Sequence, residues 1–232
     1  MCSSDLDVLD RAALAKRFPQ VVWDGVELGL YEHDRGVLMA RRAVQRLVQE
    51  FVAAGGEYRQ AAIVPPKPDA SFDSIQTAAG ETLSAPRFVF ACGPWLPKVF
   101  PEVLGQRIFT TRQEVFFFAS EPGDTRFLPG QLPGWADFND GDIFYGTPDL
   151  EARGVKVAHD RHGATIDPDN GDRVPSPQAI AEVREFMKRR LPALANRPLV
   201  ESRVCQYENS SNGDLLIDRY MEIGRASCRE RV

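Results

Sequence analysis

Chemically useful side chains are crowded between Tyr145 and Asp169, a stretch that reads YGTPDLEARGVKVAHDRHGATIDPD. Within it the run GVKVA predicts a β-strand, whose successive side chains point to opposite faces of a sheet. Lys156 would therefore face away from Val155 and Val157. Its ammonium is then either an ordinary solvated charge or a cation that meets a substrate or cofactor in a cavity.

Imidazole and carboxylate groups follow the lysine at His159, Asp160 and His162. These residues lie too close together on one strand to converge on a single zinc ion, and no other strong ligand cluster completes the set. The acidic turn 167–172 departs from a calcium-binding loop, because its glycine stands at the fifth position and Gln178 stands at the twelfth. We therefore predict that the chain has no metal site.

The composition is that of a globular protein. The 232 residues are 43% hydrophobic and 26% charged, with a formal net charge of −5 and a pI near 5.3. This acidic balance argues against nucleic-acid binding, which needs a basic face. No apolar run approaches the length of a bilayer, so we expect no membrane partner.

The two ends differ from the rest of the chain. Residues 1–6 and 222–232 resemble translated sequencing adapters, and such segments are set aside before the fold is considered. We expect the natural chain to extend beyond both ends. The remaining cysteines, Cys92 and Cys205, are far apart and have no C-x-x-C spacing, which favours a reducing, cytoplasmic setting.

Periodicity predicts the elements that must position the chemical groups. Helices are expected at 7–18, 44–52 and 176–191, the last two with a clear apolar stripe. Strands are expected within 21–31 and at 58–64, 72–77, 88–91, 107–119, 142–146, 154–158, 199–207 and 214–218. The strands 142–146 and 154–158 should be antiparallel neighbours, and the helix at 44–52 should cover a sheet.

Several motifs together resemble the flavoprotein amine oxidases of the monomeric sarcosine oxidase and N-methyltryptophan oxidase type, in the D-amino acid oxidase-like superfamily. The matching motifs, in an order and spacing that cover nearly all of 9–219, are Gly93-Pro94-Trp95, Thr111-Arg112-Gln113, Tyr145-Gly146-x-Pro148, Lys156 and Asp167-Pro168-Asp169. The resemblance implies an α/β (α+β) fold. In it a partial FAD-binding domain of glutathione-reductase type is interleaved with a substrate domain built on a mixed or antiparallel sheet.

The resemblance also implies domain boundaries. The FAD-binding domain would occupy 7–106 without its N-terminal βαβ unit, the substrate domain would occupy 107–200, and the chain would return to the FAD-binding domain at 201–221. No G-x-G-x-x-G, the motif that holds the pyrophosphate of FAD, is present near the start. We therefore expect this stretch of chain to be inactive alone and not to hold FAD unaided.

Residue roles follow from the same resemblance. Lys156 would lie beside the flavin and promote electron transfer to oxygen, as a fixed cation that stabilises developing negative charge. Tyr145 and Arg112 would bind the substrate. The residues expected to contact FAD are Val64, Gly93, Trp95 and Cys205. Cys205 aligns with the cysteine that carries FAD through a thioether in that family, and the alternative is a small buried core residue.

One position departs from the family, because Asp160 stands where the family has an active-site histidine. Either the register shifts and His159 or His162 takes the role, or a carboxylate faces the substrate amine. A carboxylate there would favour a cationic amine as substrate.

The implied function is that of an FAD-dependent oxidase. It would oxidise the C–N bond of a secondary amine or N-methyl amino acid to an imine and release hydrogen peroxide, and the intact protein would be a monomer. Two alternatives stay open. One is a dehydrogenase of the same fold with an acceptor other than oxygen, and the other is a cofactor-free binding or structural module.

Overall fold

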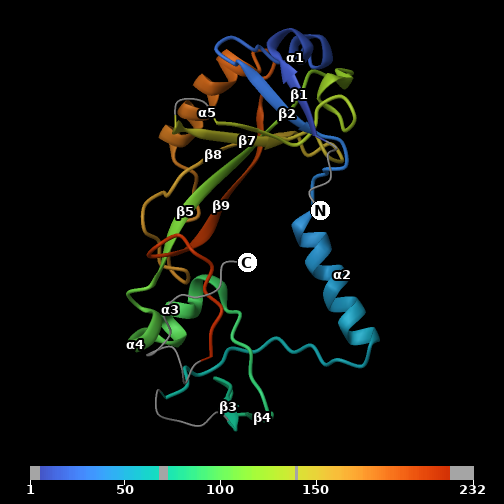
Figure 1. Cartoon of the computed structure of the whole chain (residues 1–232). Helices are drawn as coiled ribbons and strands as arrows, with labels where there is room; N and C mark the ends of the chain where they lie inside the picture. The colour runs from blue at the N-terminus through green and yellow to red at the C-terminus, as the bar shows by residue number, and fades with distance from the viewer. Residues whose placement is uncertain (1–5, 68–72, 139–140, 220–232) are drawn as a thin grey trace. The chain divides into compact units, whose positions relative to one another are not determined.

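The computed structural model describes residues 6–67, 73–138 and 141–219, and it divides into two compact units (Figure 1). The first unit comprises Met1–Met39, Gln113–His162 and Arg173–Cys205, and the second comprises Ala40–Arg112, Gly163–Asp172 and Gln206–Val232. The division falls inside the two longest strands, β5 (Ile108–Phe118) and β9 (Leu199–Ser210). The domain boundaries expected from the sequence stay a prediction.

A five-stranded sheet carries the chemically interesting residues. Its strand order is β6 (Trp135–Asp137), β7 (Ile143–Thr147), β8 (Val155–Asp160), β5 and β9. The pairs β6–β7, β7–β8 and β8–β5 are antiparallel. Hydrogen bonds from the Ala119 N–H to the Pro198 carbonyl and from the Ser211 N–H to the Arg107 carbonyl show that β5 and β9 are antiparallel too. The predicted antiparallel pairing of 142–146 with 154–158 is confirmed.

The register of β8 gives this sheet two different faces. Because successive side chains of a strand alternate, Lys156 and Asp160 lie on one face, which we call the lysine face. Val155, Val157 and His159 lie on the other, which we call the helix face.

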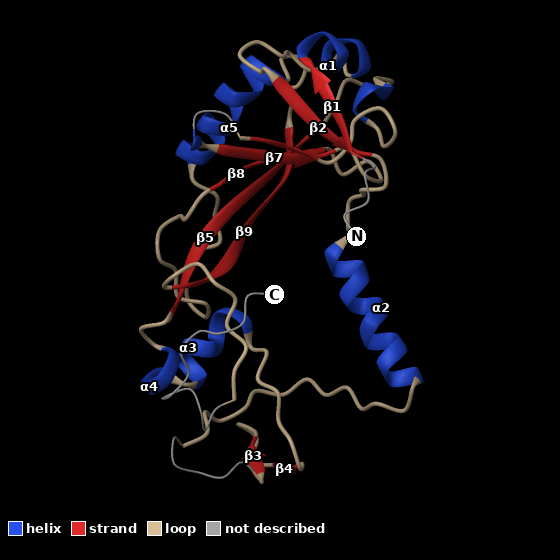
Figure 2. Ribbon diagram, in the orientation of Figure 1, coloured by secondary structure: helices blue, strands red, loops and turns tan. Residues whose placement is uncertain are grey.

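The helix face is covered by α5 (Pro177–Arg190), which runs beside β7 and β8 in Figure 2. Ser176 caps this helix by accepting a hydrogen bond from the Ala179 N–H, and Pro177 suits its first turn. The side chains that are almost completely buried between α5 and the sheet include Phe116, Phe118, Val155, Val157, Val183 and Met187. Burial of this apolar surface is the main stabilising contribution in the first unit.

The start of the chain differs from the prediction. Residues Leu6–Asp10 form a strand, β1, that pairs antiparallel with β2 (Leu28–Glu32), and the helix α1 covers only Arg11–Arg17. The Asp10 carboxylate accepts a hydrogen bond of 2.8 Å from the Ala13 N–H and so begins the helix at Arg11. The helix expected at 7–18 is therefore wrong in its first turn, because backbone pairing with β2 outweighs the helical pattern.

The second unit is built from short elements. These are α2 (Ala40–Ala53), the paired strands β3 (Ser74–Gln76) and β4 (Thr82–Ser84), the 3₁₀ turn η1 (Gly93–Trp95), α3 (Leu96–Val99) and α4 (Pro101–Leu104). Val99, Phe100, Leu104 and Ile108 form its buried core. A further 3₁₀ turn, η2 (Thr125–Phe127), belongs to the first unit.

Some expected elements are not formed in the described residues. The segments 58–64, 88–91 and 214–218 have no strand ladder; Ile63 makes only an isolated bridge with Thr77, and Val89 is 92% exposed. Of the segment 72–77, Phe72 lies outside the described residues. Helix α2 has the predicted amphipathic pattern, but none of its residues is buried, so the expectation that it covers a sheet is wrong for this structure.

No helix among the residues that the structure describes has both the length and the apolar character that a membrane span needs.

Candidate functional site

Lys156 is the second residue of β8 and has a partly buried side chain. Its Nζ is 4.5 Å from the centre of the Tyr145 ring, and it makes no hydrogen bond or ion pair with the residues that the structure describes. Burial lowers the pKa of Lys156, because it removes water from the ammonium, while the charges of Cys205 and Asp160 act in the opposite direction. A partly desolvated cation without a carboxylate partner is suited to act on a ligand that gains negative charge.

The neighbours of Lys156 form a small cluster on the lysine face. Phe117 of β5 pairs with Lys156, and Tyr145 of β7 pairs with Ala158. Val115, Phe117 and Ala158 are buried together, and Tyr145 and Cys205 pack against them. We call Lys156 and these five residues the lysine cluster. The structure thus brings together Lys156, Tyr145 and Cys205, which the sequence singled out in three separate segments.

Asp160 belongs to the same face as Lys156. It is two positions beyond Ala158 on β8 and pairs with Ile143 of β7. Its negative charge raises the pKa of Lys156 and partly offsets the effect of burial. A carboxylate is therefore available on the lysine face at the position where the resembled family has a histidine.

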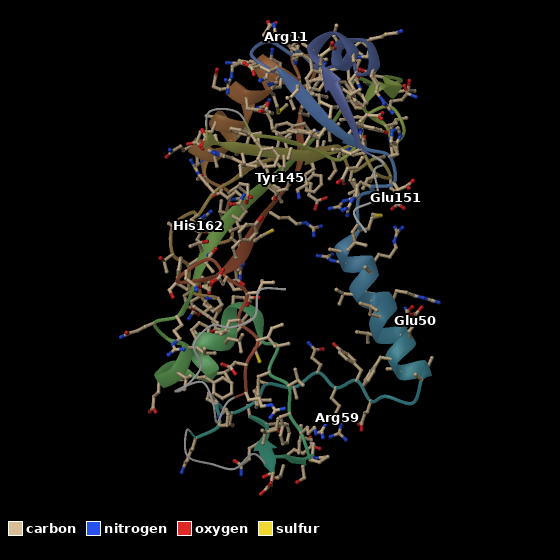
Figure 3. All side chains as sticks on the ribbon, in the orientation of Figure 1. Arg11, Glu50, Arg59, Tyr145, Glu151 and His162 are labelled. Carbon is tan, nitrogen blue, oxygen red and sulfur yellow. The ribbon has the colours of Figure 1, made fainter. Side chains whose placement is uncertain are left out.

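His159 lies on the helix face instead. Its ring stacks on Phe144 with 4.3 Å between ring centres, and its Nε2 is 3.1 Å from Asp142 Oδ1. Its Nδ1 is 3.6 Å from Glu182 Oε2, across the interface with α5. The structure therefore does not bring His159 together with Lys156. His162 is exposed beyond the end of β8, where Figure 3 labels it.

In the second unit, the Gly93-Pro94-Trp95 motif forms η1 and leads directly into α3. Gly93 has φ +54°, in the left-handed region that favours glycine. A side chain there would approach the carboxylate of Glu208, with its Cβ 3.4 Å from the nearer oxygen. The strand predicted at 88–91, just before this motif, is not formed.

A charged network fixes this motif. The Trp95 indole N–H donates to Asp169 Oδ1 over 2.7 Å, and the Lys98 ammonium pairs with both Asp167 and Asp169. The Lys98 ammonium and the N–H groups of Asn170 and Asp169 lower the pKa of Asp167 to about 2. Two motifs that the sequence offered separately, Gly-Pro-Trp and Asp-Pro-Asp, are thus joined, and sequence reasoning missed Lys98 as the link.

The other residues expected to bind a ligand also lie in the second unit. Val64 is 44% exposed, and its N–H donates to the Gln76 carbonyl over 2.8 Å. The Arg112 N–H donates to the Ala164 carbonyl over 2.9 Å. Their assigned roles stay predictions. Among the described residues, no group of three or more potential ligands is arranged to hold a metal ion.

Nearly the whole chain matches a known protein family. A family model described as "FAD dependent oxidoreductase" (DAO) matches residues 3–227. The monomeric sarcosine oxidase of Streptomyces avermitilis is 26% identical over 219 residues, which are 92% of this chain and 56% of that protein. The N-methyl-L-tryptophan oxidase of Escherichia coli O1:K1 is 24% identical over 220 residues, again 92% of this chain and 56% of that protein. The chain thus spans about half the length of the curated relatives it matches.

Solved structures share the fold. The fructosamine oxidase Amadoriase II from Aspergillus fumigatus superposes with a TM-score of 0.72 at 20% identity, covering 94% of this chain and 56% of that one. The glycine oxidase from Geobacillus kaustophilus gives a TM-score of 0.67 at 16% identity, covering 90% of this chain and 52% of that one. At these identities the structural likeness shows the fold alone.

Proposed function

Since this chain belongs to the DAO family of FAD-dependent oxidoreductases, we propose that its lysine face works in the oxidation of an amine by oxygen. The substrate is a secondary amine or N-methyl amino acid of the sarcosine type, and the products are an imine and hydrogen peroxide. The observation that carries the proposal is the partly buried Lys156 ammonium, which has no ion-pair partner among the described residues.

The side chains of the lysine cluster are chemically suited to a flavin. Phe117, Val115 and Ala158 offer an apolar surface for a flat ring, and Lys156 offers a positive charge at its edge. Cys205 adds a thiol to the same cluster. The resemblance assigns Val64, Gly93 and Trp95 to the same cofactor. Bound FAD would accept a hydride from the carbon next to the substrate nitrogen and pass two electrons to oxygen.

Lys156 contributes a positive charge from a strand that is held on both sides. The strand pairs with β5 and with β7, and the Lys156 Nζ lies 4.5 Å from the centre of the Tyr145 ring. Because burial already removes part of its water, little solvent has to reorganise around it. Tyr145 covers one side of the ammonium and forms a wall of the substrate space.

Asp160 contributes the recognition of the amine. As the carboxylate on the lysine face, it attracts a protonated amine through its charge. This favours the carboxylate alternative over His159, whose ring packs against Phe144 on the helix face.

The test replaces Lys156 by methionine, which keeps the length of the side chain and removes the charge. The enzyme would be expressed from the gene that encodes this chain. We expect flavin reoxidation by oxygen to slow about 100-fold or more, as when a preorganised charge is removed, and flavin reduction by substrate to change less than about tenfold.

Lys188→Met is the matched control, because Lys188 lies on α5 and pairs at the surface with Glu185. Rapid mixing measures the two half-reactions separately. Equal losses in both, or a loss in reduction alone, would rule out the role of Lys156. A peroxide yield well below one per turnover would identify a dehydrogenase with another acceptor instead.

A further inference from the structure

Two turns of the second unit are tied together by a single side chain, that of Lys98 on α3 (Figure 1). The Lys98 Nζ lies 2.7 Å from Asp167 Oδ2 and also pairs with Asp169. Asp169 Oδ1 in turn accepts a hydrogen bond of 2.7 Å from the Trp95 indole N–H. Lys98 therefore joins the acidic turn 167–172 to the Gly-Pro-Trp motif that precedes α3.

The backbone of each turn is anchored separately to a long strand. The Thr110 hydroxyl of β5 donates to the Pro94 carbonyl over 3.2 Å, and the Gln206 side-chain amide of β9 donates to the Pro168 carbonyl over 3.0 Å. Asp167 Oδ1 also accepts hydrogen bonds of 2.8 and 3.0 Å from two N–H groups of its own turn. Both backbones are thus fixed independently, and the charged network connects them through side chains.

The charged network contributes more to position than to stability. The side chains of Lys98, Asp167 and Asp169 are 40%, 45% and 50% exposed, and an exposed ion pair adds little to the free energy of unfolding. The indole of a tryptophan, however, can turn about its last side-chain torsion, which has a broad and roughly two-fold preference. The hydrogen bond to Asp169 selects one of these orientations, and the Lys98 ammonium holds the Asp169 carboxylate in place.

The groups that this network positions can accommodate a flat ring. Gly93 has φ +54°, and a glycine lets a ligand approach the backbone closely. Among the described residues beyond its chain neighbours, only the Glu208 carboxylate lies within 4 Å of the place where a Gly93 Cβ would stand. Trp95 is 40% exposed, so its large apolar ring is accessible. An open backbone beside an accessible indole fits the ring system of FAD, the cofactor of this family.

We propose that Lys98 is a positioning residue for the flavin, which holds the Trp95 indole through Asp169 in the orientation that bound FAD meets. The inference rests on the proposed function and extends it to a residue outside the lysine face. Lys98 need not touch FAD itself, because its ammonium is already paired with two carboxylates. Bound FAD supplies the redox chemistry, and Lys98 determines the surface against which its ring packs.

The first measurement reads the orientation of Trp95 without flavin. In the ¹⁵N-labelled chain, the Trp95 indole N–H signal is identified by its loss in Trp95→Phe, and its exchange with water is followed by NMR. We expect Lys98→Met to speed this exchange about two- to fivefold, which is the effect of losing an exposed charge pair. Lys98→Arg keeps the charge and should retain most of the protection.

The second measurement reads the oxidised flavin in the flavin-loaded enzyme by visible circular dichroism, which responds to the groups packed around the ring. We expect Lys98→Met and Asp169→Ala each to reduce the amplitude of this spectrum. The double variant should reduce it no further than Asp169→Ala alone, because both changes act through one contact. Lys98→Arg should restore the wild-type spectrum. Lys188→Met, at the exposed pair with Glu185, should leave the spectrum unchanged.

A further variant approaches the same link from the other side and serves if Lys98→Met fails to fold. Asp169→Asn keeps an oxygen that can accept the indole hydrogen bond and removes the charge that Lys98 binds. We expect it to speed exchange of the Trp95 indole proton and to reduce the flavin spectrum in the same direction as Lys98→Met.

An unchanged flavin spectrum in Lys98→Met and Asp169→Ala, effects that add in the double variant, or no rescue by Lys98→Arg would overturn the proposal. The network would then be a purely structural link. These spectra are taken on oxidised flavin at rest, so they do not depend on the reoxidation rate measured for Lys156→Met. Conversely, a reduced spectrum in Lys98→Met together with unaffected reoxidation in Lys156→Met would refute the oxidase role of Lys156 and keep the positioning role of Lys98.

Discussion

His159 and Asp160 are adjacent in the chain and lie on opposite faces of the same sheet. The His159 ring stacks on Phe144 and approaches Glu182 of α5, whereas Asp160 shares the face of Lys156 and acts on its pKa. One of these residues therefore belongs to the interface with α5 and the other to the lysine face. Their replacement should have different consequences.

For Asp160→Asn in the flavin-loaded enzyme, we expect KM for an amine substrate to rise about 10- to 100-fold, because a charge-assisted contact with the protonated amine is lost. His159→Gln should leave KM nearly unchanged and lower the melting temperature, since the stacked ring is removed. Steady-state kinetics and thermal unfolding of both variants measure this. A larger rise in KM for His159→Gln would return the substrate role to the histidine.

Lys156→Met should stabilise the first unit while it impairs the reaction. Because the pKa of Lys156 is lowered by burial, the folded state binds this proton less readily than the unfolded state. The resulting penalty is fully present below the folded pKa and disappears as the pH rises toward the ordinary value of 10.5. We expect the variant to melt at a higher temperature than the wild type at pH 7 and the difference to shrink as the pH approaches 10.5.

Thermal unfolding of both proteins from pH 6 to pH 10.5 gives the measurement. Lys188→Met should show no such convergence. A variant that is less stable than the wild type at pH 7 would mean that the ammonium has a stabilising partner in solution.

Cys205→Ala should abolish covalent attachment of the flavin. The thiol lies in the lysine cluster, where its thiolate could form a thioether to the 8α carbon of bound FAD after that methyl group loses a proton; the flavin would take up the electron pair, and oxygen would reoxidise it. After acid precipitation we expect flavin in the protein pellet of the wild type and only in the supernatant of Cys205→Ala. Cys92→Ala is the control, because burial raises the pKa of the Cys92 thiol and makes it less reactive. Flavin in the pellet of Cys205→Ala would exclude this residue as the attachment point.

Asp167 should make the second unit sensitive to strong acid. Its pKa is lowered from 3.8 to about 2, first by the hydrogen bond from Lys98, so it stabilises the folded state above pH 4, and this contribution is lost as the pH falls toward 2. Asp167→Asn should be less stable at pH 7 and should depend less on pH between 4 and 2.

Tryptophan fluorescence during thermal unfolding checks this, because Trp95 donates to Asp169 in the same network. Asp34→Asn, at an exposed turn of the first unit, is the control. An unchanged acid profile in Asp167→Asn would show that the network does not hold in solution.

The sequence predicted those features that depend on local pattern. The alternation around Lys156 gave its orientation relative to Val155 and Val157, and the register confirms it. The apolar stripe, Ser176 and Pro177 gave α5 within a residue at each end. The motifs at Tyr145, Lys156 and Asp167-Pro168-Asp169 indicated the family that the comparison establishes.

Features that depend on distant partners were not predictable. The pairing of β1 with β2 joins segments about 20 residues apart, and nothing within 7–18 indicates it. The run 88–91 is apolar enough for a buried strand, yet Val89 is 92% exposed, because composition does not supply a ladder partner. The packing of Cys205 against Val115 and Phe117 depends on the strand order, in which β9 is the neighbour of β5.

The residues on either side of Lys156 fix the register of β8 and therefore the face of the sheet on which Lys156 lies. Val155 and Val157 are both 0% exposed against α5. If β8 paired one residue out of step, the ammonium would enter that apolar interior without a counter-charge, and both valines would turn outward. The shifted pairing would therefore be less stable than the native one, whether or not a ligand is bound.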